Sequence, residues 1–216
     1  MPTGFALPPY PGRGVGLFTD TYGQPWWAYF VTGRSPASRA RALVADERGL
    51  VVASTVEGAA HDSLRHYRCA RSAGDRLVVG NGDHVDALAD ALLAGEDLAT
   101  AVERVDPEPD PPLHTARLAL VVGLAAHLVA VREEGGAVVR TVDELELRSG
   151  EGWIAHTYAG PLDEPITAAR PVPVHGVGDV VETASELWEA LDVRLRVGLA
   201  LGRAPEPVPV VTLARS

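Results

Sequence analysis

The sequence predicts an α+β protein whose sheets are mostly antiparallel. Many short apolar runs follow one another along the chain, separated by Gly, Pro, Asn or Asp, as in strands joined by short loops. Apolar residues at helical spacing occur only near 84–94, 97–104 and 179–191. Because these helices do not alternate one for one with the strands, the pattern favours α+β over an alternating parallel architecture.

Turn residues divide the chain into the predicted strands. The aromatic run from Trp26 to Val31 is apolar enough for a buried strand, and Glu47-Arg48-Gly49 and Ser72-Ala73-Gly74-Asp75 are expected to join strand pairs. The predicted strands are 15–19, 26–32, 42–46, 50–54, 64–70, 76–80, 115–121, 126–132, 137–147, 152–158 and 193–200.

Helices and loops are expected between these strands. Val85, Leu88 and Leu92 recur at helical spacing after Asn81-Gly82-Asp83, and Leu187 and Leu191 share one face of the last helix. The Pro-rich stretches 7–16 and 106–112 are predicted to be irregular. The Pro-rich C-terminal tail is expected to be loosely held.

Composition limits the classes of protein that this chain can be. It has 216 residues, 46% of them hydrophobic, and no long linker, so residues 1–216 are predicted to form a single domain. The net charge of −10 argues against nonspecific binding to nucleic acid or to an anionic membrane. All 19 basic residues are arginines, which excludes Schiff-base chemistry on a lysine.

Other features predict a cytoplasmic location. No apolar run approaches the roughly 18–20 residues of a membrane span. Met1-Pro2-Thr3-Gly4 shows no signal-peptide pattern, and the single cysteine, Cys69, cannot form an intrachain disulfide. Cys69 lies inside a predicted strand, which is typical of a buried cysteine and not of a nucleophile.

A cluster of arginine and serine follows the Trp-rich strand. Gly33 precedes Arg34, Ser35 and Arg39. Arginine can bind a phosphate or carboxylate at two points, and serine hydroxyls can complete such a pocket. The alternative is a polar turn with solvated arginines.

Two further polar groups are candidates for binding and catalysis. At Asn81-Gly82-Asp83, Gly82 permits a close backbone approach to a ligand, Asn81 could contact that ligand, and Asp83 could be the N-cap of the helix. Glu108 and Asp110 alternate with prolines, which predicts a stiff extended segment whose carboxylate suits general-base work. An acidic surface loop is the competing interpretation. Arg117 could orient a carboxylate.

A tyrosine among arginines is a third candidate. Tyr67 has Arg65, Arg68 and Arg71 nearby in sequence, an environment that would favour its phenolate and make it a proton shuttle. A packed tyrosine with a hydrogen-bonded hydroxyl is the alternative. His156 shares a strand face with Ile154, where a single histidine is usually structural. The scattered histidines show no metal-ligand spacing, so no metal site is predicted.

Several short blocks, taken together, resemble the archaeal-type IMP cyclohydrolase family. They appear in the family's order across most of the chain and depart from its pattern at Arg68, at His84, where the family tends to have glutamine, and at Leu113-His114. The matching blocks are Tyr10-Pro11-Gly12-Arg13-Gly14, Gly33-Arg34-Ser35 with Ser38-Arg39 and Arg41, Asn81-Gly82-Asp83 with Asp86, Glu108-Pro109-Asp110 with Thr115 and Arg117, Gly152 with His156-Thr157-Tyr158, and Trp188-Glu189-Ala190-Leu191.

The resemblance implies a four-layer αββα sandwich like that of the N-terminal nucleophile hydrolases. It also implies dehydrative ring closure of 5-formamidoimidazole-4-carboxamide ribotide to IMP, the last step of de novo purine biosynthesis, without a metal or redox cofactor. Met1-Pro2 offers no Ser, Thr or Cys as an N-terminal nucleophile, so the amidase chemistry of that class is disfavoured.

Matching the chemistry of this reaction to residue types gives the expected roles. Tyr67, Glu108 and Asn81 are expected to be catalytic, with Tyr67 as proton donor to the formyl oxygen, Glu108 as base and Asn81 contacting the amide or formyl group. The expected substrate-binding residues are Arg13, Arg34, Ser35, Arg39, Gly82, Asp83, Arg117 and His156.

Two alternatives to the cyclohydrolase stay open. One is a hydrolase of the same fold that acts on another amide or nucleotide, and the other is a noncatalytic purine-nucleotide-binding regulatory protein. The expected partner is a small purine ribotide, and the sequence leaves a homo-oligomer open.

Overall fold

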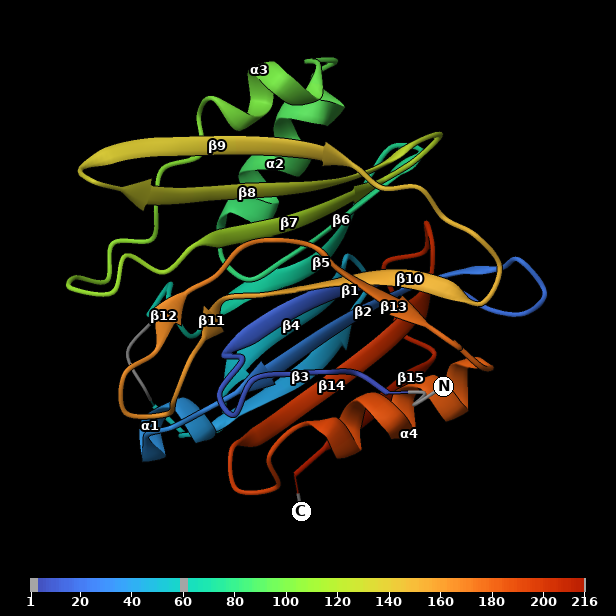
Figure 1. Cartoon of the computed structure of the whole chain (residues 1–216). Coiled ribbons are helices and arrows are strands. Elements are labelled where there is room, and N and C mark those ends of the chain that lie inside the picture. Colours follow the sequence, from blue (N-terminus) through green and yellow to red (C-terminus); the bar gives the residue numbers. More distant parts are fainter. Residues whose placement is uncertain (1–3, 59–61, 216) are drawn as a thin grey trace.

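Two antiparallel sheets face each other in the computed structural model, which describes residues 4–58 and 62–215 (Figure 1). The Met1-Pro2 terminus lies outside the described residues. The seven-stranded sheet contains, in spatial order, β3 (Arg41–Asp46), β4 (Gly49–Ser54), β5 (Tyr67–Ala73), β6 (Arg76–Gly80), β7 (Arg117–Val122), β8 (Ala126–Glu134) and β9 (Ala137–Glu144).

The second sheet draws its strands from both ends of the chain. Its spatial order is β13 (Val172–His175), β10 (Glu151–His156), β1 (Arg13–Thr19), β2 (Pro25–Thr32), β14 (Arg196–Arg203) and β15 (Val211–Ala214). A separate short pair joins β11 (Tyr158–Ala159) to β12 (Ile166–Thr167). All pairings between the described strands are antiparallel.

The main apolar core lies between the two sheets. Leu17 and Trp27 of the six-stranded sheet belong to the same buried cluster as Leu50, Leu118 and Leu120 of the seven-stranded sheet. Their neighbours point the other way, because successive side chains of a strand alternate between its faces. Strands that are covered on both faces explain the continuous apolar runs in the sequence.

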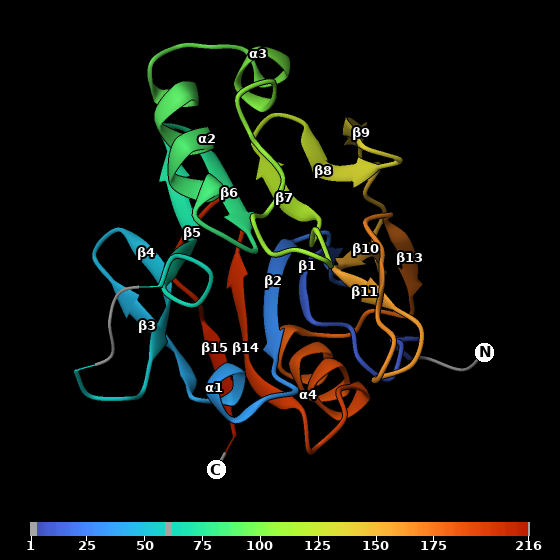
Figure 2. The ribbon, with the colours of Figure 1, turned by 90° about the vertical axis from the view of Figure 1, so that its left-hand side faces the viewer.

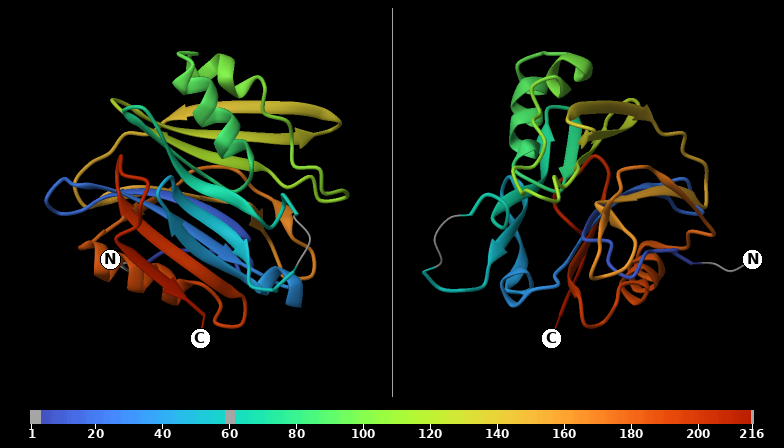
Figure 3. Two further views of the ribbon diagram at one scale, coloured as in Figure 1. Left: turned by 180° about the vertical axis from the view of Figure 1, so that it is seen from behind. Right: turned by 60° about the vertical axis from the view of Figure 1, so that its left-hand side comes forward.

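Helices cover the outer face of each sheet (Figures 1 and 2). Apolar side chains of α2 (His84–Leu93) and α3 (Leu98–Val102) pack on the outer side of the seven-stranded sheet. Apolar side chains of α4 (Val180–Ala190) pack on the outer side of the six-stranded sheet. Figure 3 shows the same arrangement from behind and from the side. No helix in the described part of the chain is long and apolar enough to cross a membrane.

The predicted α+β class with mostly antiparallel sheets is confirmed. The hairpin across Glu47 and Arg48 forms, with Asp46 paired to Gly49, and Cys69 is buried. The tail prediction was wrong, because β15 pairs with β14 over four residues. The sequence-based elements also missed β12, β13 and the short helix α1 (Pro36–Arg39).

Candidate active site

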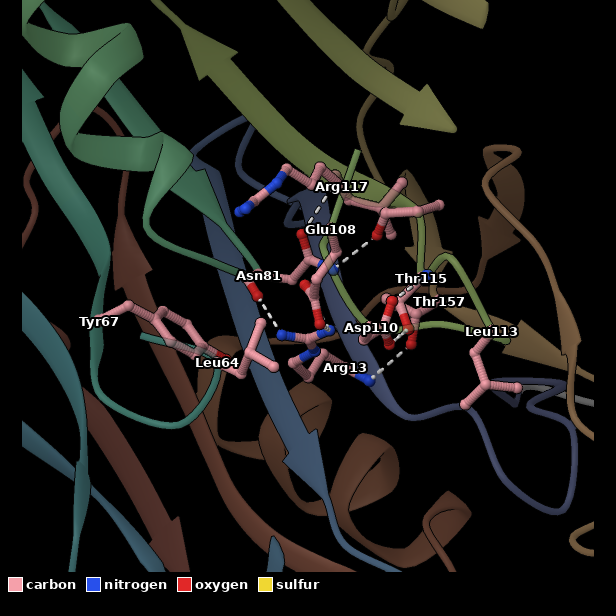
Figure 4. A network of polar contacts seen from close by, with 12 residues as sticks. Arg13, Leu64, Tyr67, Asn81, Glu108, Asp110, Leu113, Thr115, Arg117 and Thr157 are labelled. Carbon is pink, nitrogen blue, oxygen red and sulfur yellow. Dashed lines mark hydrogen bonds and ion pairs between the residues drawn. The ribbon is translucent and has the colours of Figure 1, made fainter. Parts of the chain in front are cut away.

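A buried ion pair lies at the centre of the polar network in Figure 4. Arg13 Nη2 donates to both carboxylate oxygens of Glu108, at 2.6 and 2.8 Å. Both residues are nearly inaccessible, with 7% and 4% exposure. Burial alone would lower the pKa of Arg13, but the Glu108 carboxylate outweighs it and raises that pKa well above its ordinary value. Arg13 therefore stays charged inside the protein.

The same guanidinium joins the two sheets. Arg13 begins β1 of the six-stranded sheet, and its Nη1 donates to the backbone oxygen of Asn81, just beyond β6 of the seven-stranded sheet, at 2.6 Å. The chain reaches Arg13 through Gly12, which has φ of +71° and would place any Cβ 2.2 Å from Thr157 Oγ1. The Thr157 hydroxyl in turn accepts from the Arg13 backbone N–H. Gly12 is thus required by backbone conformation and by close packing.

The Asn81 side chain holds the start of β7. Its Oδ1 accepts from Leu118 N at 2.7 Å, and its Nδ2 donates to Ala116 O at 2.9 Å. Asn81 is fully buried. Since both ends of the amide are engaged with backbone, Asn81 fixes the carbonyl that Arg13 binds, while its predicted contact with substrate stays a prediction.

A pair of tyrosines connects the sheets beside the ion pair. Tyr67 at the start of β5 and Tyr29 of β2 have hydroxyls 2.7 Å apart. The Arg13 guanidinium lies 6.0 Å from the centroid of the Tyr67 ring. Burial raises the pKa of Tyr29 well above its ordinary value, despite the nearby Arg13 charge. Tyr29 therefore stays protonated.

The arginines expected beside Tyr67 were the wrong ones. Arg68 pairs with Asp46, and Arg71 pairs with Asp86 and Asp90 on the α2 side of the sheet. Arg65 pairs with Asp62 before β5 begins. Strand alternation carries Arg68 to the opposite face from Tyr67, so the arginine beside the Tyr67 ring comes from β1 and not from its own strand.

The expected stiff, extended carboxylate segment was also wrong. Asp110 N donates to Glu108 O at 2.9 Å, so the chain turns between the two acids. Glu108 points to Arg13, whereas Asp110 accepts hydrogen bonds from the backbone and the hydroxyl of Thr115. The surface-loop alternative fails for Glu108, because this side chain is buried.

An aromatic stack extends the network toward the surface. Because the Thr115 hydroxyl donates to Asp110, its oxygen accepts from the Tyr158 hydroxyl. The Tyr158 ring stacks on Tyr10, with centroids 5.4 Å apart and planes at 16°. Burial raises the pKa of both tyrosines. These residues lie in blocks that the sequence marked, but no local signal separated Tyr10, Tyr158 or Thr115 from packing residues.

The predicted anion-binding loop joins this stack through Arg34. The exposed Arg34 guanidinium lies 5.7 Å from the Tyr10 ring centroid. Ser35 is the N-cap of α1 and accepts from Ser38 N. Arg39 donates to the backbone oxygen of Arg34 at 3.0 Å. Arg39 and Ser35 thus shape the loop that presents Arg34.

A second polar cluster lies on the other side of the seven-stranded sheet. Arg117 contacts Asp83 Oδ1 at 2.5 Å and donates to His84 Nδ1 at 3.2 Å. Asp83 occupies the N-cap position of α2 without a side-chain cap hydrogen bond, because its carboxylate turns to Arg117. A Cβ on Gly82 would lie 2.7 Å from Arg117 Nη1. Arg117 does orient a carboxylate, but that carboxylate is Asp83 and not Glu108.

The protonation of His84 follows from its two contacts. Its Nδ1 faces the Arg117 donor, so its Nε2 carries the proton and donates to Leu118 O at 3.0 Å. Burial first, and then the Arg117 charge, lower the pKa of His84 to about 3. The ring is therefore neutral at ordinary pH.

His156 is not brought into the Arg13 network. It pairs with Gly14, on the face of the sheet that carries Phe30 and Ile154 toward α4, whereas Arg13 lies on the opposite face. Its Nδ1 contacts the Tyr158 backbone oxygen at 2.8 Å, and burial lowers its pKa. Among the residues that the structure describes, no three His, Cys, Asp or Glu side chains gather as a metal site.

The family of the chain follows from sequence comparison. Residues 10–204 match the model of the family described as IMP cyclohydrolase-like protein. The chain belongs to this family. The match spans every residue of the network around Arg13, from Tyr10 to Tyr158.

Curated relatives come from haloarchaea and methanogens. The IMP cyclohydrolase of Haloquadratum walsbyi is 30% identical over 172 residues, which cover 77% of this chain and 80% of that protein. The IMP cyclohydrolase of Natronomonas pharaonis is 31% identical over 75% of this chain and 78% of that protein. That of Methanococcus maripaludis strain C7 is 26% identical over 69% and 74%.

Replacing one partner of the buried ion pair is expected to destabilise the fold. Glu108→Gln leaves the Arg13 charge unpaired, which typically costs about 3–5 kcal/mol of unfolding free energy. The double variant Arg13→Met/Glu108→Leu should lose less than the sum of the losses in the single variants Arg13→Met and Glu108→Leu, because no isolated charge remains. Urea denaturation measures this coupling. Arg194→Gln, which breaks an exposed pair with Asp192, is the control and should leave stability nearly unchanged; strictly additive losses at Arg13 and Glu108 would contradict the prediction.

His84 is expected to make the fold less stable in acid. Its pKa is about 3 in the folded protein and 6.5 in the unfolded chain. Above pH 6.5 neither state binds the proton. Between pH 6.5 and 3 the unfolded chain binds it and the folded protein does not, so stability falls as pH falls, by up to about 1.4 kcal/mol per pH unit.

Urea denaturation between pH 4 and 8 measures this dependence. His84→Gln should flatten the slope below pH 6.5, whereas His175→Gln, at an exposed histidine, should keep it. An unchanged slope in His84→Gln would mean that His84 titrates normally in the folded protein.

Proposed function

We propose that this protein is an IMP cyclohydrolase, which closes the ring of 5-formamidoimidazole-4-carboxamide ribotide to give IMP and water. Membership of the family, and several curated relatives named IMP cyclohydrolase over most of the chain, support an enzyme of this activity. The observation that carries the proposal is the convergence of separate sequence blocks on one buried network. Tyr10–Arg13, Asn81, Glu108–Thr115 and Thr157–Tyr158 meet there from distant parts of the chain.

The reaction needs one proton donor and one proton acceptor, each used twice. In the first step the carboxamide nitrogen attacks the formyl carbon and loses a proton, while the formyl oxygen gains one and becomes a hydroxyl. In the second step that hydroxyl leaves as water with a proton, and the former formamido nitrogen loses its own. Atoms and charges balance, and both catalytic groups return to their first state.

Tyr67 and Glu108 are proposed as this donor and acceptor. Tyr67 gives its proton to the formyl oxygen in the first step and regains one in the second, while Glu108 takes the carboxamide proton and returns it to the leaving hydroxyl. Arg13 lies against both groups and orients Glu108. Because the two reacting groups belong to one molecule, positioning supplies much of the rate.

The proposed phosphate pocket is the loop of Arg34, Ser35 and Arg39. It lies beside the aromatic stack. Its arginines supply local positive charge in a protein whose net charge is −10. Asn81 is proposed to act by fixing the carbonyl that holds Arg13. Substrate contacts of Gly82, Asp83, Arg117 and His156 stay predictions, as does a cytoplasmic location.

The fold is proposed to be the four-layer αββα sandwich of the N-terminal nucleophile hydrolases, used without their nucleophile. An apolar cluster between two antiparallel sheets, with helices packed outside each, supports this.

Turnover of the formylated ribotide, followed by ultraviolet absorbance, tests the proposed function. The protein should form IMP, and Tyr67→Phe should lower kcat by about 10²–10⁴-fold while IMP affinity changes little. Tyr22→Phe, at an exposed tyrosine, is the matched control and should keep the full rate. If IMP binds but none forms, the protein is a noncatalytic purine-nucleotide-binding protein; if IMP neither forms nor binds, a hydrolase acting on another compound is favoured.

Arg34→Ala should weaken binding of IMP more than binding of inosine. Loss of a charge-assisted contact to phosphate typically costs roughly 1.5–3 kcal/mol, or more than tenfold in Kd. Calorimetric titration of both ligands into wild type and variant gives the comparison. Arg148→Ala, at an exposed arginine outside this loop, should leave both affinities unchanged. Equal losses for IMP and inosine in Arg34→Ala would place Arg34 outside the phosphate pocket.

A further inference from the structure

The hydroxyls of Tyr29 and Tyr67 form a buried pair that joins the two sheets. Tyr29 is fully buried, and its hydroxyl has one hydrogen-bond partner among the described residues, the Tyr67 hydroxyl at 2.7 Å. Tyr67 is buried as well, so the geometry alone allows either hydroxyl to donate. In the proposed reaction Tyr67 gives its own proton to the formyl oxygen, so toward Tyr29 its oxygen accepts and Tyr29 donates.

This direction prepares Tyr67 to release its proton. When Tyr67 gives up the proton, the resulting phenolate oxygen keeps the hydrogen bond from Tyr29 and gains strength from its negative charge. The Arg13 guanidinium, 6.0 Å from the centroid of the Tyr67 ring, places a positive charge beside that ring. Glu108, paired with Arg13, partly offsets that charge, and the neighbouring Cys69 is neutral because burial raises its pKa.

We infer that Tyr29 is a positioning residue for the cyclisation, which sets the direction of the Tyr67 hydroxyl and stabilises its phenolate while the formyl oxygen holds the proton. The inference rests on the proposed function, with Tyr67 as donor. Tyr29 does not touch the substrate in this scheme. It comes from the opposite sheet, so the relative placement of the two sheets controls the donor.

The test compares Tyr29→Phe, Tyr67→Phe and the double variant with wild type. Tyr29→Phe should lower kcat on the order of tenfold and leave KM within about twofold, because a hydrogen bond to a charged group is lost from the transition state. The alkaline limb of the kcat–pH profile should move to higher pH by about one unit, since the phenolate is less favoured. In the Tyr67→Phe background, Tyr29→Phe should have no further effect on kcat.

Two results would overturn the inference. One is an alkaline limb that stays in place in Tyr29→Phe, and the other is an equal loss of kcat with and without Tyr67; either would reduce Tyr29 to packing. Tyr22→Phe is again the control. If Tyr29→Phe does not fold, 3-fluorotyrosine at position 29 keeps the shape and makes a stronger donor, and should move the alkaline limb to lower pH.

A titration without substrate separates this inference from the proposed function. Phenolate absorbance near 295 nm that is lost in Tyr67→Phe should arise at lower pH in wild type than in the Tyr29→Phe background. If wild type forms no IMP but this difference is seen, the proposed function fails and the hydrogen bond from Tyr29 to the Tyr67 phenolate stands. If IMP forms but the difference is absent, the inference about Tyr29 fails alone.

Discussion

The buried ion pair between Arg13 and Glu108 is the constraint on which the rest of the site depends. A charge inside an apolar sandwich must be paired. Removing either partner leaves the other charge buried and unpaired, which is costly. The pair joins residues 95 positions apart, and the same guanidinium binds the carbonyl of Asn81. One side chain therefore holds together the start of β1, the end of β6 and the loop before β7.

The polar groups around this pair are satisfied mostly by one another. Asn81 binds the backbone of β7, Thr157 accepts from the Arg13 backbone, and Tyr29 pairs with Tyr67. Each contact crosses between elements that the apolar core alone would leave free to slide, because apolar contacts are non-directional. The core between the sheets stabilises the fold, and the polar network selects one relative placement of the sheets at this end.

Local patterns predicted the elements better than they predicted the site. Periodicity and turn residues were sufficient for β1, β2, α2 and α4, whereas the short strands β12 and β13 carry too few residues to show a pattern. For the site, sequence proximity misled. Arg68 and Arg71 stand next to Tyr67 in the chain but face α2, and the prolines beside Glu108 suggested a straight segment where the chain turns. The role of Tyr29 could not be predicted from the sequence, because a run of aromatic residues in a buried strand does not show which hydroxyl meets a partner from the other sheet.

The same strand alternation bears on Arg68, where the sequence was expected to depart from the family pattern, and makes this residue compatible with the proposed activity. Arg68 bonds Asp46 on the face away from Tyr67, so the charge it introduces does not reach the inter-sheet network directly. Within that network the charges of Arg13 and Glu108 offset each other, which suits the neutral carboxamide and formyl groups of the proposed substrate. Its phosphate requires a cation, and the exposed Arg34 beside the Tyr10 ring is proposed to supply one, without a second charge having to be buried. Charges in the interior are thus paired, whereas the unpaired charge lies at the exposed rim, as the cost of burying charge requires. This division matches the proposed substrate, whose phosphate lies at the end opposite its reacting atoms.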